Sequence, residues 1–158
     1  MTDDAWLTRL EAEHSALDLP RFDRADAWRL GSSIAERALA EGHPVAIDVR
    51  TASVVLFHAS MPGATADNDD WARRKAATAF RFETSTALLE ARVAAGGRDM
   101  FEPGWLDPAE YAVAGGAVPV RVTGVGVVAV ATVSGLPSAD DHELVVHGLT
   151  ELRARHGS

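Results

Sequence analysis

The sequence predicts an α+β protein in which helices pack against a mostly antiparallel sheet. Four segments have the alternation or the valine-rich composition of β-strands, and they occur as two pairs with short connections. Helical patterns lie before, between and after these pairs. Parallel strands would instead need a long crossover, usually a helix, between successive strands. The order of elements therefore favours an α+β sandwich over a parallel doubly wound fold.

Two helices are expected before the first strand. From Asp3 to Leu17 apolar residues recur near helical spacing, and Pro20 prevents this helix from continuing. Asp23 is a suitable N-cap for a second helix over Arg24 to Glu41, and Gly42 suits its C-cap.

The strands are predicted as two antiparallel hairpins. Pro44 to Arg50 alternates apolar and polar residues, and Ser53 to Ala59 is rich in apolar residues, with a short turn between them. Ala117 to Thr123 and Val125 to Ser134 form the second pair. The last of these segments is apolar on both faces, which predicts a central strand.

Two further helices are predicted, one between the hairpins and one after them. A long helix is expected from Asn68 to Ala95, and a single helical turn from Asp107 to Tyr111. Ser138 is the expected cap of the last helix, which runs to about Arg155. Asp141, three residues after Ser138, resembles the second member of a capping box.

Composition narrows the class of protein. The chain has 158 residues, a net charge of −8 and no cysteine, so we expect one domain spanning residues 1–158. Without cysteine, disulfides, thiolate metal sites and a cysteine nucleophile are excluded, which suits a reducing cytoplasm. The negative charge disfavours nucleic acid as a partner. Neither a secretory signal nor a membrane span of ~20 apolar residues is recognisable, so a cytoplasmic protein without a membrane partner is expected.

Three blocks of sequence together resemble a known family. They are Asn68 to Lys75 (NDDWARRK), Asp107 to Pro119, and Gly124 to His142, which contains SGLP and DDH. Their order and spacing resemble the GlcG/HbpS-like haem-degrading-domain family, nearest to its small cytosolic branch of uncharacterised proteins. The likeness covers Leu19 to Leu152, so residues 1–18 are expected to be an N-terminal helical extension.

The resemblance implies a profilin-like or PAS-like α-β-α sandwich around a mostly antiparallel sheet of about five strands. It also implies homo-oligomers built from dimers. Some relatives bind haem or iron, so haem is the cofactor that the resemblance suggests. The haem-binding relatives do not share one axial ligand, and no residue of this chain is therefore assigned that role by likeness.

Two histidines are weak candidates for a haem or metal ligand. His58 lies at a strand end beside Phe57 and Met61, and it would otherwise be a partly exposed strand-end residue. His142 lies in the first turn of the last helix, where the helix dipole disfavours a positive ring. Its alternative role is structural, as a packed residue beside acidic side chains that cap the helix.

The predicted long helix carries a mixed polar and apolar face. Trp71, Lys75, Thr78 and Phe82 fall on it at helical spacing. We interpret this face as a subunit interface or a pocket wall, with an ordinary amphipathic helix as the alternative. Trp71 and Trp105 are the expected aromatic anchors of an interface.

Buried charge and glycine-rich turns supply two further hypotheses. Arg121 on a predicted inner strand would need a carboxylate, and Asp48 is the proposed partner unless the strand is an exposed edge. Gly115 and Gly116 do not form a phosphate-binding loop and are interpreted as turn residues.

The candidate ligand-binding or interface residues are Asn68, Trp71, Arg74, Lys75, Tyr111, Gly115, Gly116, Ser134, Asp140, Asp141 and His142.

Three functions remain open from the sequence. The first is an oligomeric ligand- or partner-binding protein, and the second is a haem- or tetrapyrrole-binding protein with weak haem degradation. The third is an enzyme acting on a small molecule, for which His142 with Asp140 or Asp141 is the acid–base pair that the sequence offers. The first is favoured, because no clear ligand constellation appears in the sequence.

Overall fold

The computed structural model describes residues 3–157 and confirms the α+β class. Within those residues the elements are α1 (Asp3–Ala16), α2 (Arg24–Glu41), β1 (Ala46–Arg50), β2 (Val55–Ser60), α3 (Ala66–Phe82), α4 (Thr86–Ala94), β3 (Ala117–Val122), β4 (Gly126–Ser134) and α5 (Ser138–His156). No helix in this part of the chain is long and apolar enough to cross a membrane.

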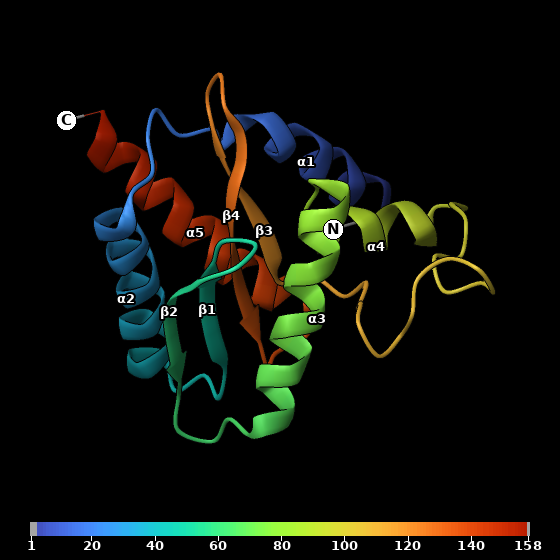
Figure 1. The fold of residues 1–158 in the computed structure, drawn as a ribbon, viewed down its shortest axis with the longest axis horizontal. Helices are drawn as coiled ribbons and strands as arrows, with labels where there is room; N and C mark the ends of the chain where they lie inside the picture. Colours follow the sequence, from blue (N-terminus) through green and yellow to red (C-terminus); the bar gives the residue numbers. More distant parts are fainter. Residues whose placement is uncertain (1–2, 158) are drawn as a thin grey trace.

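One antiparallel sheet with the strand order β2-β1-β4-β3 forms the middle layer. The expected α-β-α sandwich is confirmed: α2 and α5 cover one face of the sheet and α3 covers the other (Figure 1). Both predicted hairpins are present, and β4 is an inner strand as predicted. The sheet of residues 3–157 has four strands, where the family resemblance implied about five.

The two faces of the sheet are packed differently because strand residues alternate in direction. Ile47 and Val49 of β1 belong to the main apolar core, together with residues of α2 and α5 such as Ile34 and Val145. The face under α3 is lined by smaller and more polar side chains. A small cluster built around Ala76, Ala79, Ala117 and Val130 packs there, and Asp48, Thr132 and Ser134 are buried strand residues of the alternate set.

The ends of α2 follow the sequence prediction. Asp23 and Asp26 form a capping box: the Asp26 amide donates to Asp23 Oδ1 at 2.8 Å, and the Asp23 amide donates to Asp26 Oδ2 at 3.0 Å. Gly42 ends the helix in the left-handed conformation, with φ of 72°. These local signals are sufficient because every partner lies within a few residues.

The single long helix predicted from Asn68 to Ala95 is wrong, because the chain turns between α3 and α4. Glu83 adopts a left-handed conformation with φ of 51°, which ends α3. Ser85 then caps α4, its hydroxyl accepting a hydrogen bond from the Leu88 amide at 3.2 Å. The helical periodicity continues across this break, so the break itself was not visible in the apolar pattern.

The predicted pair of Asp48 and Arg121 does not form. The two residues lie on β1 and β3, which β4 separates. Asp48 is buried and accepts hydrogen bonds from Arg50, whose Nε lies 3.0 Å from each carboxylate oxygen. Arg121 instead contacts the backbone oxygen of Glu83 and the ring of His14. Arg121 thereby links the end of α3 to the end of α1.

The predicted capping box of α5 also does not form. The N-cap position is Pro137, and Ser138 is the first residue of the helix. The hydroxyl of Ser138 donates to Glu90 Oε2 at 3.2 Å. Asp141 points toward the turn before the helix, where Leu136 donates to its carboxylate.

Candidate functional site at the start of α5

A buried ion pair joins α3 to the first turn of α5. The ammonium of Lys75 lies 2.9 Å from Asp141 Oδ2 and donates a second hydrogen bond to the Val133 carbonyl at 3.3 Å. The side chains of Lys75 and Asp141 are only 5% and 1% exposed. Since breaking a buried pair leaves an uncompensated charge, this contact fixes the position of α5 relative to α3.

The Asp141 carboxylate has its acceptor positions filled by the protein. Besides Lys75, the backbone amides of Gly135 and Leu136 donate to it at 3.3 and 2.9 Å. Burial raises the pKa of the Asp141 carboxyl, although Lys75 and the two amides act in the opposite direction. The group is therefore a structural anchor for the turn that precedes α5.

Gly115 and Gly116 lie where the backbone must approach this pair closely. A Cβ on Gly115 would come within 2.6 Å of the Ser138 carbonyl oxygen, and one on Gly116 within 2.3 Å of the Val133 oxygen. Gly116 also has φ of 135°, which side chains rarely adopt. The close approach of the backbone accounts for glycine at both positions.

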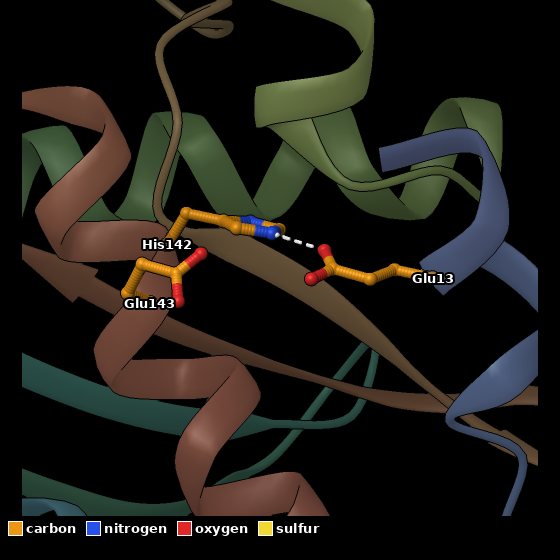
Figure 2. A group of neighbouring side chains, drawn as sticks. All are labelled: Glu13, His142 and Glu143. Atoms are coloured by element: carbon orange, nitrogen blue, oxygen red, sulfur yellow. Dashed lines mark hydrogen bonds and ion pairs between the residues drawn. The ribbon is translucent and has the colours of Figure 1, made fainter. Parts of the chain in front are cut away.

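The hydrogen-bond partner of His142 is a residue that the sequence did not predict. Its Nε2 lies 2.8 Å from Glu13 Oε1 of α1, and its ring packs nearly perpendicular to that of Trp6, with 5.8 Å between the ring centroids. The imidazole is 1% exposed. Figure 2 shows the Glu13 carboxylate reaching from α1 toward the ring, with Glu143 beside it.

The acid–base pair suggested for an enzyme is not assembled. Asp141 is engaged with Lys75, and Asp140 is exposed at the edge of a groove of about 470 Å³ between α2 and α5. The cavity beside His142 has a volume of about 20 Å³, room for about one water molecule. His142 thus has Glu13 as its partner, and the cavity that it lines with other residues of the 3–157 segment is too small for a substrate.

The remaining candidates on α3 lie near its start. Asn68 completes the N-terminal cap of α3, its amide oxygen accepting from the Thr65 amide at 2.9 Å. The Arg74 guanidinium lies 4.1 Å from the centroid of the Trp71 ring, and its Nε is 2.9 Å from Asp70. These contacts define a surface cluster away from the buried Lys75.

Tyr111 and Ser134 complete the set of predicted residues. Tyr111 lies under the Arg81 guanidinium, at 5.2 Å from the ring centroid. Ser134 is buried at the end of β4, opposite Ala46. The structure therefore groups Lys75 and Asp141 with the two glycines, and it brings Arg74 and Trp71 together at another place on α3.

His58 lies on the edge strand β2, with its side chain 40% exposed and its Nε2 3.2 Å from Asp69 Oδ1. The sequence interpretation of a partly exposed histidine agrees with this exposure, but the predicted position at the strand end does not, because β2 continues to Ser60.

Exposed apolar side chains gather on α2 and β2. Trp28 of α2 is 64% exposed and contacts the ring of Phe57 on β2 edge-on, at a centroid distance of 5.7 Å. Val55 at the start of β2 is 53% exposed, whereas Trp71 is only 37% exposed. Trp28 is therefore more exposed than Trp71, which the sequence analysis proposed as an interface anchor. We call Trp28, Val54, Val55 and Phe57 the edge patch.

The fold agrees with the comparisons with known proteins. The sequence profile of the family described as haem degrading protein HbpS-like matches residues 22–150, and the chain belongs to this family. Its curated relatives include UPF0303 proteins. One from Burkholderia mallei is 48% identical over 143 residues, 90% of this chain and 87% of that protein. Another, from Streptomyces avermitilis, is 43% identical over 94% of this chain and 91% of that protein.

Solved structures show the same fold. The Ybr137w protein is similar with a TM-score of 0.85 and 30% identity, over 96% of this chain and 90% of that one. A double mutant of HbpS from Streptomyces reticuli has a TM-score of 0.66 and 28% identity over 84% of this chain and 87% of its own. A PduOC–haem complex, at 19% identity and a TM-score of 0.64, covers 82% of this chain and 93% of its own.

Proposed function

We propose that the protein is a homo-oligomeric binding protein of the cytoplasm whose copies associate through the edge patch. The observation that carries this proposal is the exposure of Trp28 and Val55, at 64% and 53%, beside a free sheet edge. Exposed apolar groups that lie together commonly mark a protein interface, and tryptophan is enriched among residues that dominate binding. The lack of cysteine suits the reducing compartment.

The sheet edge supplies the second half of the argument. Within residues 3–157, β2 pairs only with β1, so one side of its backbone has no strand beside it. Soluble proteins usually protect such an edge with proline, lysine or a covering element. The sequence of β2, VLFHAS, has neither residue type.

A second copy of the chain is the partner that fits this edge. Two β2 strands related by a twofold axis would pair antiparallel and extend the sheet across both copies. The twofold axis would also place Trp28 and Val55 of both copies at one surface, because such an interface uses the same patch on each subunit. The proposal therefore concerns a dimer, from which larger assemblies could be built.

Light scattering coupled to size-exclusion chromatography at micromolar concentration tests this proposal. The wild-type protein is expected to elute as a dimer or a multiple of it, and Trp28→Glu with Val55→Lys is expected to shift the mass toward the monomer. Val125→Lys is the matched control, because Val125 is 71% exposed but lies in the β3–β4 turn. A monomeric wild type would refute the proposal, as would equal masses for all three proteins.

Haem or tetrapyrrole binding is the alternative, supported by the family description and by the haem complex of PduOC. The residues of one chain do not fit an enclosed haem site at either predicted histidine. The cavity beside His142 holds about 20 Å³, and His58 is on an exposed strand. A haem group would therefore need a surface that another copy completes.

Titration with haemin distinguishes the alternative from the favoured function. A saturable Soret band that is lost in His58→Ala but kept in His43→Ala would support haem binding. His43 is a suitable control because it is a half-buried histidine paired with Glu41. Absence of a saturable band would leave self-association as the remaining function.

A further inference from the structure

Three metal-ligating side chains converge where α1 meets α5. Ligand atoms of Glu13, His142 and Glu143 all lie within 4.8 Å of one another. The imidazole is at the buried end, with His142 1% exposed, while the side chains of Glu13 and Glu143 are 17% and 42% exposed. Figure 2 shows the three side chains side by side at this junction.

The buried imidazole is only partly satisfied. Its Nε2 faces Glu13, but its Nδ1 is buried and has no hydrogen-bond partner among residues 3–157. Buried side-chain nitrogens are usually paired, and each exception calls for an explanation. Neutral imidazole is the commonest metal ligand among side chains, and it can bind through either ring nitrogen.

Arg9 provides an independent sign that this position favours a cation. Its guanidinium contacts both carboxylates, at 3.3 Å from Glu13 Oε2 and 2.5 Å from Glu143 Oε1. Two carboxylates at such close range repel each other unless a positive charge lies between them. The Arg9 side chain is 39% exposed, so it has room to turn into solvent and release the carboxylates.

We propose that Glu13, His142 and Glu143 bind a divalent transition-metal ion such as Zn²⁺, and that Arg9 supplies the positive charge when no metal is bound. Zinc accepts histidine nitrogen and carboxylate oxygen as ligands, and three protein ligands would leave the fourth position of its tetrahedral shell open. Arg9 and Glu13 lie outside residues 22–150, the segment that the family profile matches. The proposal is independent of self-association through the edge patch.

Binding would also have a structural consequence. Glu13 is on α1, whereas His142 and Glu143 are on α5, so a shared ion would fasten the N-terminal helix to the sandwich. An ion bound only by the folded protein raises the free energy of unfolding by mass action. Zinc should therefore raise the melting temperature and slow proteolysis of α1.

The test is calorimetric titration of EDTA-treated protein with zinc chloride. We expect one tight site per chain in the wild type. The zinc affinity of Glu143→Gln should be lower by a factor of about ten or more, since loss of an interaction at a metal site commonly costs that much. Glu143 is suited to this test because its side chain is 42% exposed, and its removal should not prevent folding. Glu11→Gln is the matched control, because Glu11 lies on the same helix as Glu13 but pairs with Arg92.

Arg9→Gln separates the two parts of the proposal. Removing the competing guanidinium is expected to tighten zinc binding several-fold, whereas loss of a merely structural arginine would leave the affinity unchanged or weaken it. Equal zinc affinity in wild type, Glu143→Gln and Glu11→Gln would overturn the metal site. The absence of saturable zinc binding to the wild type would overturn it as well.

Discussion

Lys75 and Asp141 form a buried ion pair, with 2.9 Å between Nζ and Oδ2, although they are 66 positions apart in the chain. The pair connects α3 on one face of the sheet with the first turn of α5, which covers the other face. It lies at the end of β4, where the Val133 carbonyl accepts a second hydrogen bond from Lys75. The three layers of the sandwich are thus joined at one point.

Loss of Lys75 should strongly destabilise the protein. Lys75→Met leaves the Asp141 carboxylate buried without its cation, and such a change typically costs about 3–5 kcal/mol. Urea unfolding measures this loss. The double variant Lys75→Met with Asp141→Leu should lose less free energy of unfolding than the two single variants lose together, because neither charge remains. Strictly additive losses would show that the pair is not energetically coupled.

Gly116 should be intolerant of a side chain. Gly116→Ala places a Cβ 2.3 Å from the Val133 oxygen on a backbone with φ of 135°, and we expect a loss of about 2 kcal/mol or more. Gly124→Ala is the control, since Gly124 also has positive φ, at 78°, but nothing within 4 Å of the added atom. Its expected cost is about 1 kcal/mol. Equal losses in urea unfolding would contradict the importance of the close approach.

Stability should fall at acid pH partly through Asp26. Burial by itself would raise the pKa of the Asp26 carboxyl, but hydrogen bonds from His156 and the Asp23 amide outweigh it and lower that pKa. The carboxylate therefore stabilises the fold above the unfolded pKa of about 3.9, and this contribution is lost as the pH falls through the lower folded value.

Asp26→Asn should accordingly lower the free energy of unfolding at pH 7 by about 1–2 kcal/mol. It should also make the decline of stability below about pH 4 less steep. Asp140→Asn is the control, because Asp140 is exposed. Chemical unfolding at a series of pH values measures both effects. A variant that keeps the wild-type acid slope would show that Asp26 does not cause it.

Substitution of Trp28 should weaken association through the edge patch without destabilising the folded monomer. The residue is 64% exposed, so Trp28→Glu should change the free energy of unfolding of a monomer by less than about 0.5 kcal/mol. Dissociation of an oligomer would appear instead as a mass change and as a melting temperature that no longer depends on protein concentration. A large loss of stability at all concentrations would mean that Trp28 acts within one chain.

The sequence by itself determined the elements whose causes are local. The cap at Asp23, the stop at Gly42, the two hairpins and the inner position of the strand ending at Ser134 all follow from neighbouring residues. Family motifs extended this to the three-layer sandwich. The sequence did not show that the backbone at Gly115 and Gly116 approaches Ser138 and Val133 closely.

Only the tertiary structure decided which charged residues meet. Lys75 has Asp141 as its partner, Asp48 has Arg50, and His142 has Glu13, which lies 129 positions earlier. An ion pair depends on how helices and strands are brought together in space. Residue type and periodicity do not predict the distance between two side chains that are far apart in the sequence. The break after Phe82 follows the same principle. The apolar periodicity runs through it, and the turn becomes evident only where Arg121 binds the Glu83 carbonyl and Ser85 begins a new helix.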